Sequence, residues 1–304
     1  MRIAILSNGP GNYSTKRLKR VALDRGHEVD VIKYRDCYAS IEKSQPLVLH
    51  HGHPLVGYDA IIPRIASSMT KYGSAIVRQF EMQGVYTLTS SISIVRSRDK
   101  LRSMQLLSRA GVGIPKTVVA RGGSTEVEDL IDQLGGTPVI IKLARGTHGN
   151  GVVLADTKKA AKSVLQAFYV MDQDGTNILL QEFVKESAGE DIRAFVVGGK
   201  VIASMKRQSL DDDFRSNLHQ GGAGEAIKLT DEERKTAIKA AKSMGLNVCG
   251  VDMMRSARGP LVLEVNSSPG FGIEKVTNRD VATPIIEYLE MNARRRNKKD
   301  KIGA

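Results

Sequence analysis

Short apolar runs alternate with amphipathic stretches over residues 1–92. The runs at 2–7 and 28–32 are typical of strands, and a glycine ends the helix-like stretch between them. A further apolar run at 58–65 is followed by a second helix-like stretch, residues 74–83. Strands that alternate with helices favour a parallel sheet with helices on its faces. We therefore expect residues 1–92 to form a small α/β domain.

The pattern changes over residues 93–181. Apolar runs at 117–120 and 139–143 flank a helix with a capping-box spacing. A glycine-rich loop, 144–151, then leads directly into another strand, 151–156. In a dinucleotide-binding domain the glycine loop opens a helix, whereas this loop connects two strands. The sequence thus excludes a Rossmann-type oxidoreductase and predicts a separate α+β module.

A second β-rich module is predicted over residues 182–291. Two alternating runs within 192–207 are separated by a glycine pair, which is a hairpin signal. Two more strands, 248–254 and 261–266, are joined by a short polar connection. Together with a capped helix between these strand pairs, the pattern predicts another α+β module.

The chain of 304 residues carries a formal net charge of +12. Part of this excess lies in residues 292–304, a basic tail that we expect to reach solvent. The remaining positive charge favours partners that carry phosphate or carboxylate groups. The absence of Trp and the 5% share of aromatic residues count against a stacking surface for single-stranded nucleic acid.

Composition excludes several classes of protein. No apolar run approaches the ~20 residues of a membrane span, and the apolar stretch after Met1 is too short for a signal peptide. Cys37 and Cys249 are the only cysteines and lie far apart, which disfavours a disulfide scaffold and a zinc module. We therefore expect a cytoplasmic protein that does not associate with membranes.

Asp252, Glu264 and Asn266 are the strongest candidates for metal ligands. Glu264 and Asn266 are two apart on one strand and share a face, and a hairpin turn near Arg258 would bring Asp252 opposite Glu264. Carboxylate and amide oxygens suit Mg²⁺. Because both acids lie in apolar runs, each needs a cation to compensate for its burial. The alternative to a metal is an ion pair with an arginine such as Arg255.

Glycines and cations outline a phosphate site. Glycines let backbone amides approach a phosphate, although a glycine-rich hairpin is also common without one. Lys142 is a lone cation in an apolar strand, and Lys100 lies on a helix face that solvent could equally cover. The candidate phosphate ligands are Lys100, Lys142, Gly146, Gly149, Gly151, Arg193, Arg215 and Asn217.

A histidine-rich segment, residues 50–53, carries side chains that transition metals accept. It lies beside Pro54, and we interpret it as a surface loop. The sequence alone therefore assigns no site to these histidines.

Five motifs follow one another across nearly the whole chain. They are RDKLRSMQLL (98–107), VIIKLARGTHGNGVVLA (139–155), LLQEFVKESAGEDIRAFVVG (179–198), DFRSNLHQGG (213–222) and CGVDMMRSARGPLVLEVNSSPG (249–270). DFRSNLHQGG together with EVNSSPG is the most specific combination. In this order the motifs resemble the ATP-grasp ligases, and among them the RimK group of ribosomal-protein-modifying glutamate ligases.

The resemblance implies a fold and a nucleotide site. The fold would be a Rossmann-like pre-ATP-grasp domain followed by an ATP-grasp fold, whose two α+β modules clasp ATP. Two Mg²⁺ or Mn²⁺ ions would be held by Asp252, Glu264 and Asn266, with Glu264 bridging them. The nucleotide would contact Lys100, Lys142, Arg215 and Asn217 through its phosphates, Glu182, Phe183 and Val184 through adenine, and Lys185, Glu190 and Asp191 near the ribose.

The reaction implied by the resemblance joins a carboxylate to an amine through an acyl phosphate. Arg193 and Arg207 would hold the acyl phosphate and the substrate carboxylate, and Arg215 an ATP phosphate, so these arginines are the expected catalytic residues. The group adds glutamate to the C-terminus of a small-subunit ribosomal protein. We therefore expect ATP, L-glutamate, the acidic C-terminal tail of that protein, the ribosome and further copies of the chain as partners.

Two alternatives remain open. The first is a ligase that adds glutamate or another amino acid to a carrier protein or a small cofactor, because acceptor contacts are poorly encoded in local motifs. The second is a non-catalytic nucleotide-binding or RNA-associated basic protein. A non-catalytic relative would be free to lose its metal ligands, and all three predicted ones are present.

Overall fold

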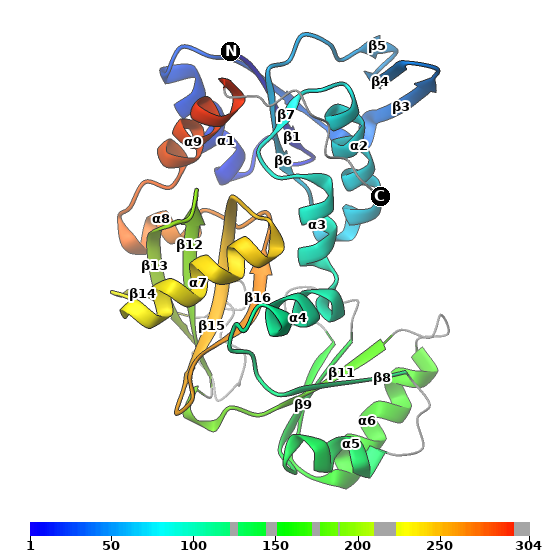
Figure 1. Cartoon of the computed structure of the whole chain (residues 1–304), viewed down its shortest axis with the longest axis vertical. Helices are drawn as coiled ribbons and strands as arrows, with labels where there is room; N and C mark the ends of the chain where they lie inside the picture. Colours follow the sequence, from blue (N-terminus) through cyan, green and yellow to red (C-terminus); the bar gives the residue numbers. More distant parts are fainter. Residues whose placement is uncertain (122–126, 144–150, 172–176, 188, 210–222, 295–304) are drawn as a thin grey trace.

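The computed structural model describes residues 1–121, 127–143, 151–171, 177–187, 189–209 and 223–294. Three main sheets follow one another along the long axis of the molecule, with the third sheet in the chain lying between the other two (Figure 1). None of the helices within the described residues is long and apolar enough to cross a membrane.

The first sheet is parallel, with the strand order β2-β1-β6-β7. Successive side chains of β1 point to opposite faces of the sheet, and both faces are covered. Ile3 packs in one apolar cluster with Leu18, and Leu6 packs in another with Phe80. The α/β domain predicted from the sequence is confirmed. Its elements are β1 (Arg2–Ser7), α1 (Tyr13–Asp24), β2 (Glu28–Ile32), β6 (Ala60–Arg64), η2 (Ser67–Met69), α2 (Thr70–Met82) and β7 (Tyr86–Thr87).

A small antiparallel sheet, β3-β4-β5, interrupts this domain and was not predicted. It consists of β3 (Cys37–Glu42), β4 (Gln45–His50) and β5 (His53–Pro54), and follows η1 (Tyr34–Asp36). The surface-loop interpretation of residues 50–53 is therefore wrong in part, because His50 and His53 are paired strand residues and only His51 and Gly52 form the turn. Most of β3 is exposed, so it lacks the apolar run that reveals a strand.

The second main sheet is antiparallel, with the order β10-β9-β11-β8. Ile131 and Leu165 lie on the two helices that cover this sheet. They pack with Ile141 and Leu180 of the sheet in an apolar cluster that is separate from those of the other sheets. The predicted strand–loop–strand arrangement is confirmed by the pairing of β9 with β10. The elements are α3 (Ser91–Arg98), α4 (Lys100–Arg109), β8 (Thr117–Arg121), α5 (Val127–Leu134), β9 (Val139–Leu143), β10 (Val152–Ala155), α6 (Lys158–Met171) and β11 (Asn177–Glu182).

The third main sheet is also antiparallel, with the order β14-β13-β12-β15-β16. Helix α7 packs on it and begins with a capping box formed by Thr230 and Glu233, as the spacing predicted. The elements are η3 (Lys185–Ser187), β12 (Glu190–Val197), β13 (Lys200–Gln208), β14 (Ala223–Ala226), α7 (Asp231–Met244), β15 (Val248–Ser256), β16 (Gly259–Asn266), α8 (Gly272–Thr277) and α9 (Ala282–Arg294).

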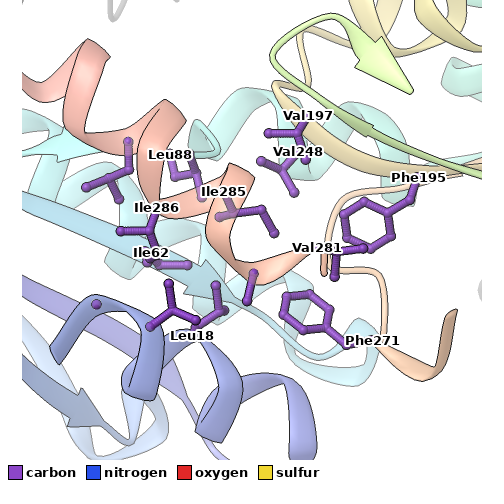
Figure 2. Packing of buried hydrophobic residues seen from close by; sticks show 14 of the residues in the cluster. Leu18, Ile62, Leu88, Phe195, Val197, Val248, Phe271, Val281, Ile285 and Ile286 are labelled. Carbon is purple, nitrogen blue, oxygen red and sulfur yellow. The ribbon is translucent and has the colours of Figure 1, made fainter. Parts of the chain in front are cut away.

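One apolar cluster joins the first and third sheets. Figure 2 shows Ile285 of α9 between Ile62 of the first sheet and Phe195 of the third, and all three belong to the same buried cluster. At its edge Arg25 Nη2 lies 2.7 Å from Glu290 Oε2, so α9 is also tied to the end of α1 by an ion pair. Helix α9 therefore fixes the third sheet to the N-terminal domain.

Candidate functional site

Strands β15 and β16 bring the three predicted metal ligands together. Asp252 is opposite Glu264 and Gly250 is opposite Asn266, which confirms the predicted register. The amide nitrogen of Asn266 donates to Glu264 Oε1 at 2.9 Å and to Asp252 Oδ2 at 3.3 Å. Asp252 is buried, whereas Glu264 is exposed. One acid is thus part of the sheet interior, and the other reaches solvent beside it.

Asp252 is bound by two arginines of the same sheet. Arg193 Nε donates to Oδ1 at 2.6 Å and Nη2 to Oδ2 at 2.5 Å, while Arg207 Nη2 lies 3.0 Å from Oδ2. The expected alternative partner, Arg255, instead donates to Glu233 Oε1 at 2.6 Å. Arg255 was therefore the wrong candidate, because Arg193 is the direct cross-strand neighbour of Asp252 and Arg255 is three residues further along β15.

The acid–arginine network comprises Asp191, Arg193, Arg207 and Asp252. Arg207 is opposite Asp191 in the β12–β13 register and donates to it from Nε at 2.6 Å. Burial opposes the charge on both arginines, but Asp252 raises the pKa of each. Burial alone would favour a protonated Asp252, yet Arg193 and Arg207 lower its pKa well below the usual range. Two acids and two guanidinium groups thus balance one another inside the sheet.

Lys100 and Lys142 lie together at the junction of α4 and β9. Lys100 Nζ donates to the backbone oxygen of Leu143 at 2.8 Å, and Lys142 Nζ donates to Oε1 of Gln181. Burial lowers the pKa of both lysines, and the neighbouring charge of Lys100 helps to lower the pKa of Lys142 to about 8. Two half-buried cations with neutral partners are an arrangement suited to a polyanion such as a phosphate chain.

The residues expected to contact adenine begin where β11 ends. Glu182 Oε1 accepts a hydrogen bond from the backbone nitrogen of Lys116 at 2.6 Å and another from Arg258 Nη2. Val184 is buried and Phe183 half-buried. Because Lys116 precedes β8 of the second sheet and Arg258 lies in the β15–β16 turn of the third, Glu182 connects the two α+β modules.

The remaining predicted residues are placed as follows. Gly151 has a φ of +74°, and a Cβ there would lie 3.1 Å from the side chain of Leu143, so this position requires glycine. Lys185 is exposed, and Glu190 Oε1 lies 3.4 Å from Lys206 Nζ. Outside the described residues lie Gly146, Gly149, Arg215, Asn217 and residues 295–304 of the predicted tail.

A second group of cations was not predicted. Arg64 Nη2 donates to the backbone oxygen of Pro269 at 2.7 Å, and Arg98 Nη2 donates to another backbone oxygen at 3.0 Å. Burial lowers the pKa of both, that of Arg64 to about 10. Among the described residues, Arg98 Nε and the hydroxyls of Ser267 and Ser268 are buried without a hydrogen-bond partner. The available signal was that Arg64, like Lys142, is a lone cation in an apolar strand.

The β15–β16 residues fit a divalent cation. Asp252, Glu264 and Asn266 offer carboxylate and amide oxygens, the ligand type that Mg²⁺ and Mn²⁺ prefer. Rotation of the Asn266 amide would turn its oxygen toward an ion, and the Glu264 carboxylate is exposed. Mg²⁺ in proteins commonly takes a few carboxylates and completes its shell with water and phosphate oxygens.

The chain matches two family descriptions that together span most of its length. Residues 1–94 match a RimK PreATP-grasp domain and residues 97–289 match a RimK-like ATP-grasp domain. The "Probable alpha-L-glutamate ligase" of Hydrogenovibrio crunogenus is 57% identical over 300 residues, which cover 98% of each chain. The protein with the same description from Aliivibrio fischeri is 58% identical over 294 residues, or 96% of each chain.

Solved structures share the fold at lower identity. The ATP-grasp ligase PsnB, complexed with minimal precursor, Mg and ADP, gives a TM-score of 0.72 at 20% identity over 96% of this chain and 98% of that one. D-cycloserine synthetase DcsG gives 0.72 at 17% identity over 96% and 100% of the two chains. The predicted N-terminal α/β domain followed by an ATP-grasp fold is thus confirmed, and the chain belongs to the RimK family of ATP-grasp ligases.

Proposed function

We propose that this ligase adds L-glutamate to the C-terminus of a small-subunit ribosomal protein through an acyl phosphate. The observation that carries the proposal is that opposite charges meet around the β15–β16 hairpin. The oxygen ligands proposed on β15 and β16 lie next to Arg193 and Arg207. The negative charge of Glu264 acts on both Lys100 and Lys142 and favours their protonated forms. ATP, a divalent metal and a carboxylate substrate each find groups of the required chemistry.

In the first step, the acceptor carboxylate attacks the γ-phosphorus of ATP. A carboxylate–phosphorus bond forms, the bond to the β-phosphate oxygen breaks, and ADP leaves. Lys100 and Lys142 would hold the phosphates, and Asp252, Glu264 and Asn266 would hold two Mg²⁺ or Mn²⁺ ions. Bound there, the metal ions supply neutralisation of phosphate charge, which is most of what phosphoryl transfer requires.

In the second step, the amino group of glutamate attacks the acyl carbon. A carbon–nitrogen bond forms, phosphate leaves and the amine loses a proton. Arg193 uses Nε and Nη2 for Asp252, which leaves Nη1 available for the acyl phosphate. Arg207 likewise uses Nε and Nη2 for Asp191, and its Nη2 also lies 3.0 Å from Oδ2 of Asp252. These contacts hold both guanidinium groups rigidly, and within the described residues Nη1 of each remains a donor for substrate oxygens.

Glutamate and an acidic acceptor fit the charge distribution of the chain. A net charge of +12 attracts a polyanionic tail over a distance of about one Debye length, 8–10 Å at physiological salt. Arg64 and Arg98, together with the buried hydroxyls of Ser267 and Ser268, are suited to bind a substrate carboxylate. The relatives described as alpha-L-glutamate ligases support glutamate as the amino acid that is added. A ribosomal acceptor would place the reaction in the cytoplasm.

The main alternative is a different acceptor. PsnB has been solved with a precursor peptide, and DcsG is a D-cycloserine synthetase, so similar folds accommodate peptide and small-molecule chemistry. A carrier protein or a small cofactor would therefore be compatible with the same ATP site.

The experiment incubates the protein with ATP, Mg²⁺, L-glutamate and a set of acceptors. These are a peptide with the acidic C-terminus of a small-subunit ribosomal protein, intact small subunits, and a carrier protein. We expect mass increases in steps of one glutamyl residue on the ribosomal acceptor alone, with stoichiometric ADP. Addition to the carrier protein only would contradict the proposed acceptor while leaving the ligase chemistry intact.

Glu264→Ala should abolish ADP release without changing the fold, because Glu264 is exposed and its side chain packs against little. Glu287→Ala is the matched control, since Glu287 is a half-exposed acid on α9. Undiminished ADP release by Glu264→Ala would refute the metal assignment.

A further inference from the structure

Three side chains that the proposed reaction does not use converge in the N-terminal domain. One ligand atom from each of Asp36, His50 and His51 lies within 4.8 Å of the other two. Asp36 is the last residue of η1, His50 the last residue of β4, and His51 opens the turn toward β5. The pairing of Cys37 with His50 in the β3–β4 register is what brings the end of η1 beside the hairpin tip.

The turn explains how two consecutive histidines reach the same acid. Along a strand, successive side chains point to opposite faces, so His50 and His51 would diverge if β4 continued. His51 instead has a φ of +49°, in the left-handed region, and its ring centroid lies 4.2 Å from that of His50 at an interplanar angle of 61°. The backbone turn thus gathers both imidazoles on the side of Asp36.

We propose that Asp36, His50 and His51 form a binding site for Zn²⁺. Two imidazoles and one carboxylate are a ligand set that zinc binds well, and three protein ligands leave a fourth position for water. Tetrahedral ligands about 2.0–2.2 Å from zinc lie roughly 3.4 Å from one another. The three ligand atoms lie within 4.8 Å of one another, so small side-chain rotations would bring them to that spacing. The oxygen ligands on β15 and β16 favour a harder cation, which makes the two sites chemically distinct.

The surroundings are compatible with this assignment. Arg35 Nε lies 3.5 Å from Asp36 Oδ1, but this ion pair is solvent-exposed and therefore weak enough for a metal to displace. Cys37 is a poor fourth ligand, because burial raises the pKa of its thiol to about 12.

A bound ion would connect η1 to the tip of the β4–β5 hairpin. This sheet is small and largely exposed, and β5 has only two residues. A ligand that binds the folded state alone stabilises it in proportion to the logarithm of its concentration over Kd. Zinc is therefore expected to raise the thermal midpoint of the domain without needing nucleotide.

The experiment titrates Zn²⁺ into the full chain against a chromophoric chelator, without nucleotide and in millimolar Mg²⁺, which occupies oxygen-only sites. We expect one zinc ion per chain and a weakening of at least about tenfold in both His50→Ala and Asp36→Asn. His53→Ala is the matched control, because His53 is opposite His50 in the β4–β5 register but exposed and outside the cluster. Its affinity should equal that of the unmodified chain.

Two further measurements keep the result interpretable. Co²⁺ should give the visible absorption of a tetrahedral site in the unmodified chain and lose it in His50→Ala. Glu264→Ala should bind zinc normally, so a failure of the ligase proposal and a failure of the zinc site are distinguishable. Unchanged zinc affinity in His50→Ala, or an equal loss in His53→Ala, would overturn the assignment.

Discussion

Two groups of basic side chains meet around the proposed nucleotide site and differ in how their charge is compensated. Arg193 and Arg207 on the third sheet bond to acids, which raise their pKa values despite burial. Lys142, Arg64 and Lys100 bond to amide or backbone oxygens, and burial lowers their pKa values. Within the described residues the first group bonds directly to carboxylates, whereas the second bonds to neutral oxygens and has only the more distant charge of Glu264, which supports an anion site there.

The difference follows from topology. Arg193 and Asp252 are direct cross-strand neighbours, as are Arg207 and Asp191, so one antiparallel register pairs both arginines with acids. The second group is assembled from β6, α4 and β9, which belong to different parts of the fold. Their charges converge only when these parts pack together, and the proposed ligand would supply negative charge.

Breaking the first group should have the largest effect. Asp252→Asn leaves Arg193 and Arg207 without their shared carboxylate in a buried site, so we expect the free energy of unfolding to fall by about 3–5 kcal/mol, along with loss of turnover. Glu264→Gln removes an exposed charge and should change the free energy of unfolding by less than about 1 kcal/mol while also abolishing turnover. Chemical denaturation of both variants measures the contrast. Equal stability losses would mean that the network is not the stabilising element.

Removing a cation of the second group should mainly affect binding. Lys142→Met is expected to weaken nucleotide affinity by roughly 10–100-fold, the loss of one charge-assisted hydrogen bond to a phosphate. Lys239→Met is the control, because Lys239 also donates to a backbone oxygen but is exposed on α7. Calorimetric titration with a non-hydrolysable ATP analogue measures both. Unchanged affinity in Lys142→Met would remove this lysine from the phosphate site.

The same lysine should leave a signature in the pH dependence of stability. Its pKa is about 8 in the folded chain and near 10.5 when unfolded. Below pH 8 both states are protonated and the cost of burying the charge is fully present. As pH rises from about 8 to 10.5 the folded state releases the proton first, so the unmodified protein should gain stability relative to Lys142→Met. A constant difference in thermal midpoint between pH 7 and 10 would contradict this.

The smallest effect is expected at the exposed end of β15. The Arg255 side chain is 55% exposed, and its partner Glu233 also accepts a hydrogen bond from the backbone nitrogen of Thr230 at 2.8 Å. Arg255→Ala should therefore lower the free energy of unfolding by less than about 1 kcal/mol and leave turnover unchanged. A loss as large as that of Asp252→Asn would show that the two ion pairs are equally important.

Features set by local pattern could be predicted from the sequence. The pairing of Asp252 with Glu264 was predicted from strand alternation and a turn near Arg258, although a register shift between Asp252 and Met253, which the sequence did not reveal, contributes to it. The start of α7 followed from the spacing of Thr230 and Glu233. The motifs gave the family. Sequence reasoning failed where the outcome depends on long-range pairing, as in the choice of Arg193 over Arg255 as the partner of Asp252. It also failed for the exposed strand β3, whose residues carry little apolar signal.

Helix α9 has a consequence for the order in which the molecule can be completed. Leu18 and Ile62 of the first domain are buried together with Ile285 and Ile286, which are among the last described residues of the chain. Translation delivers these partners only after the strands of all three main sheets have emerged, so the apolar face that they cover stays accessible to other apolar surfaces until then. The N-terminal domain is synthesised first but is therefore expected to complete its folding last. A chain truncated before α9 should expose this apolar face and aggregate.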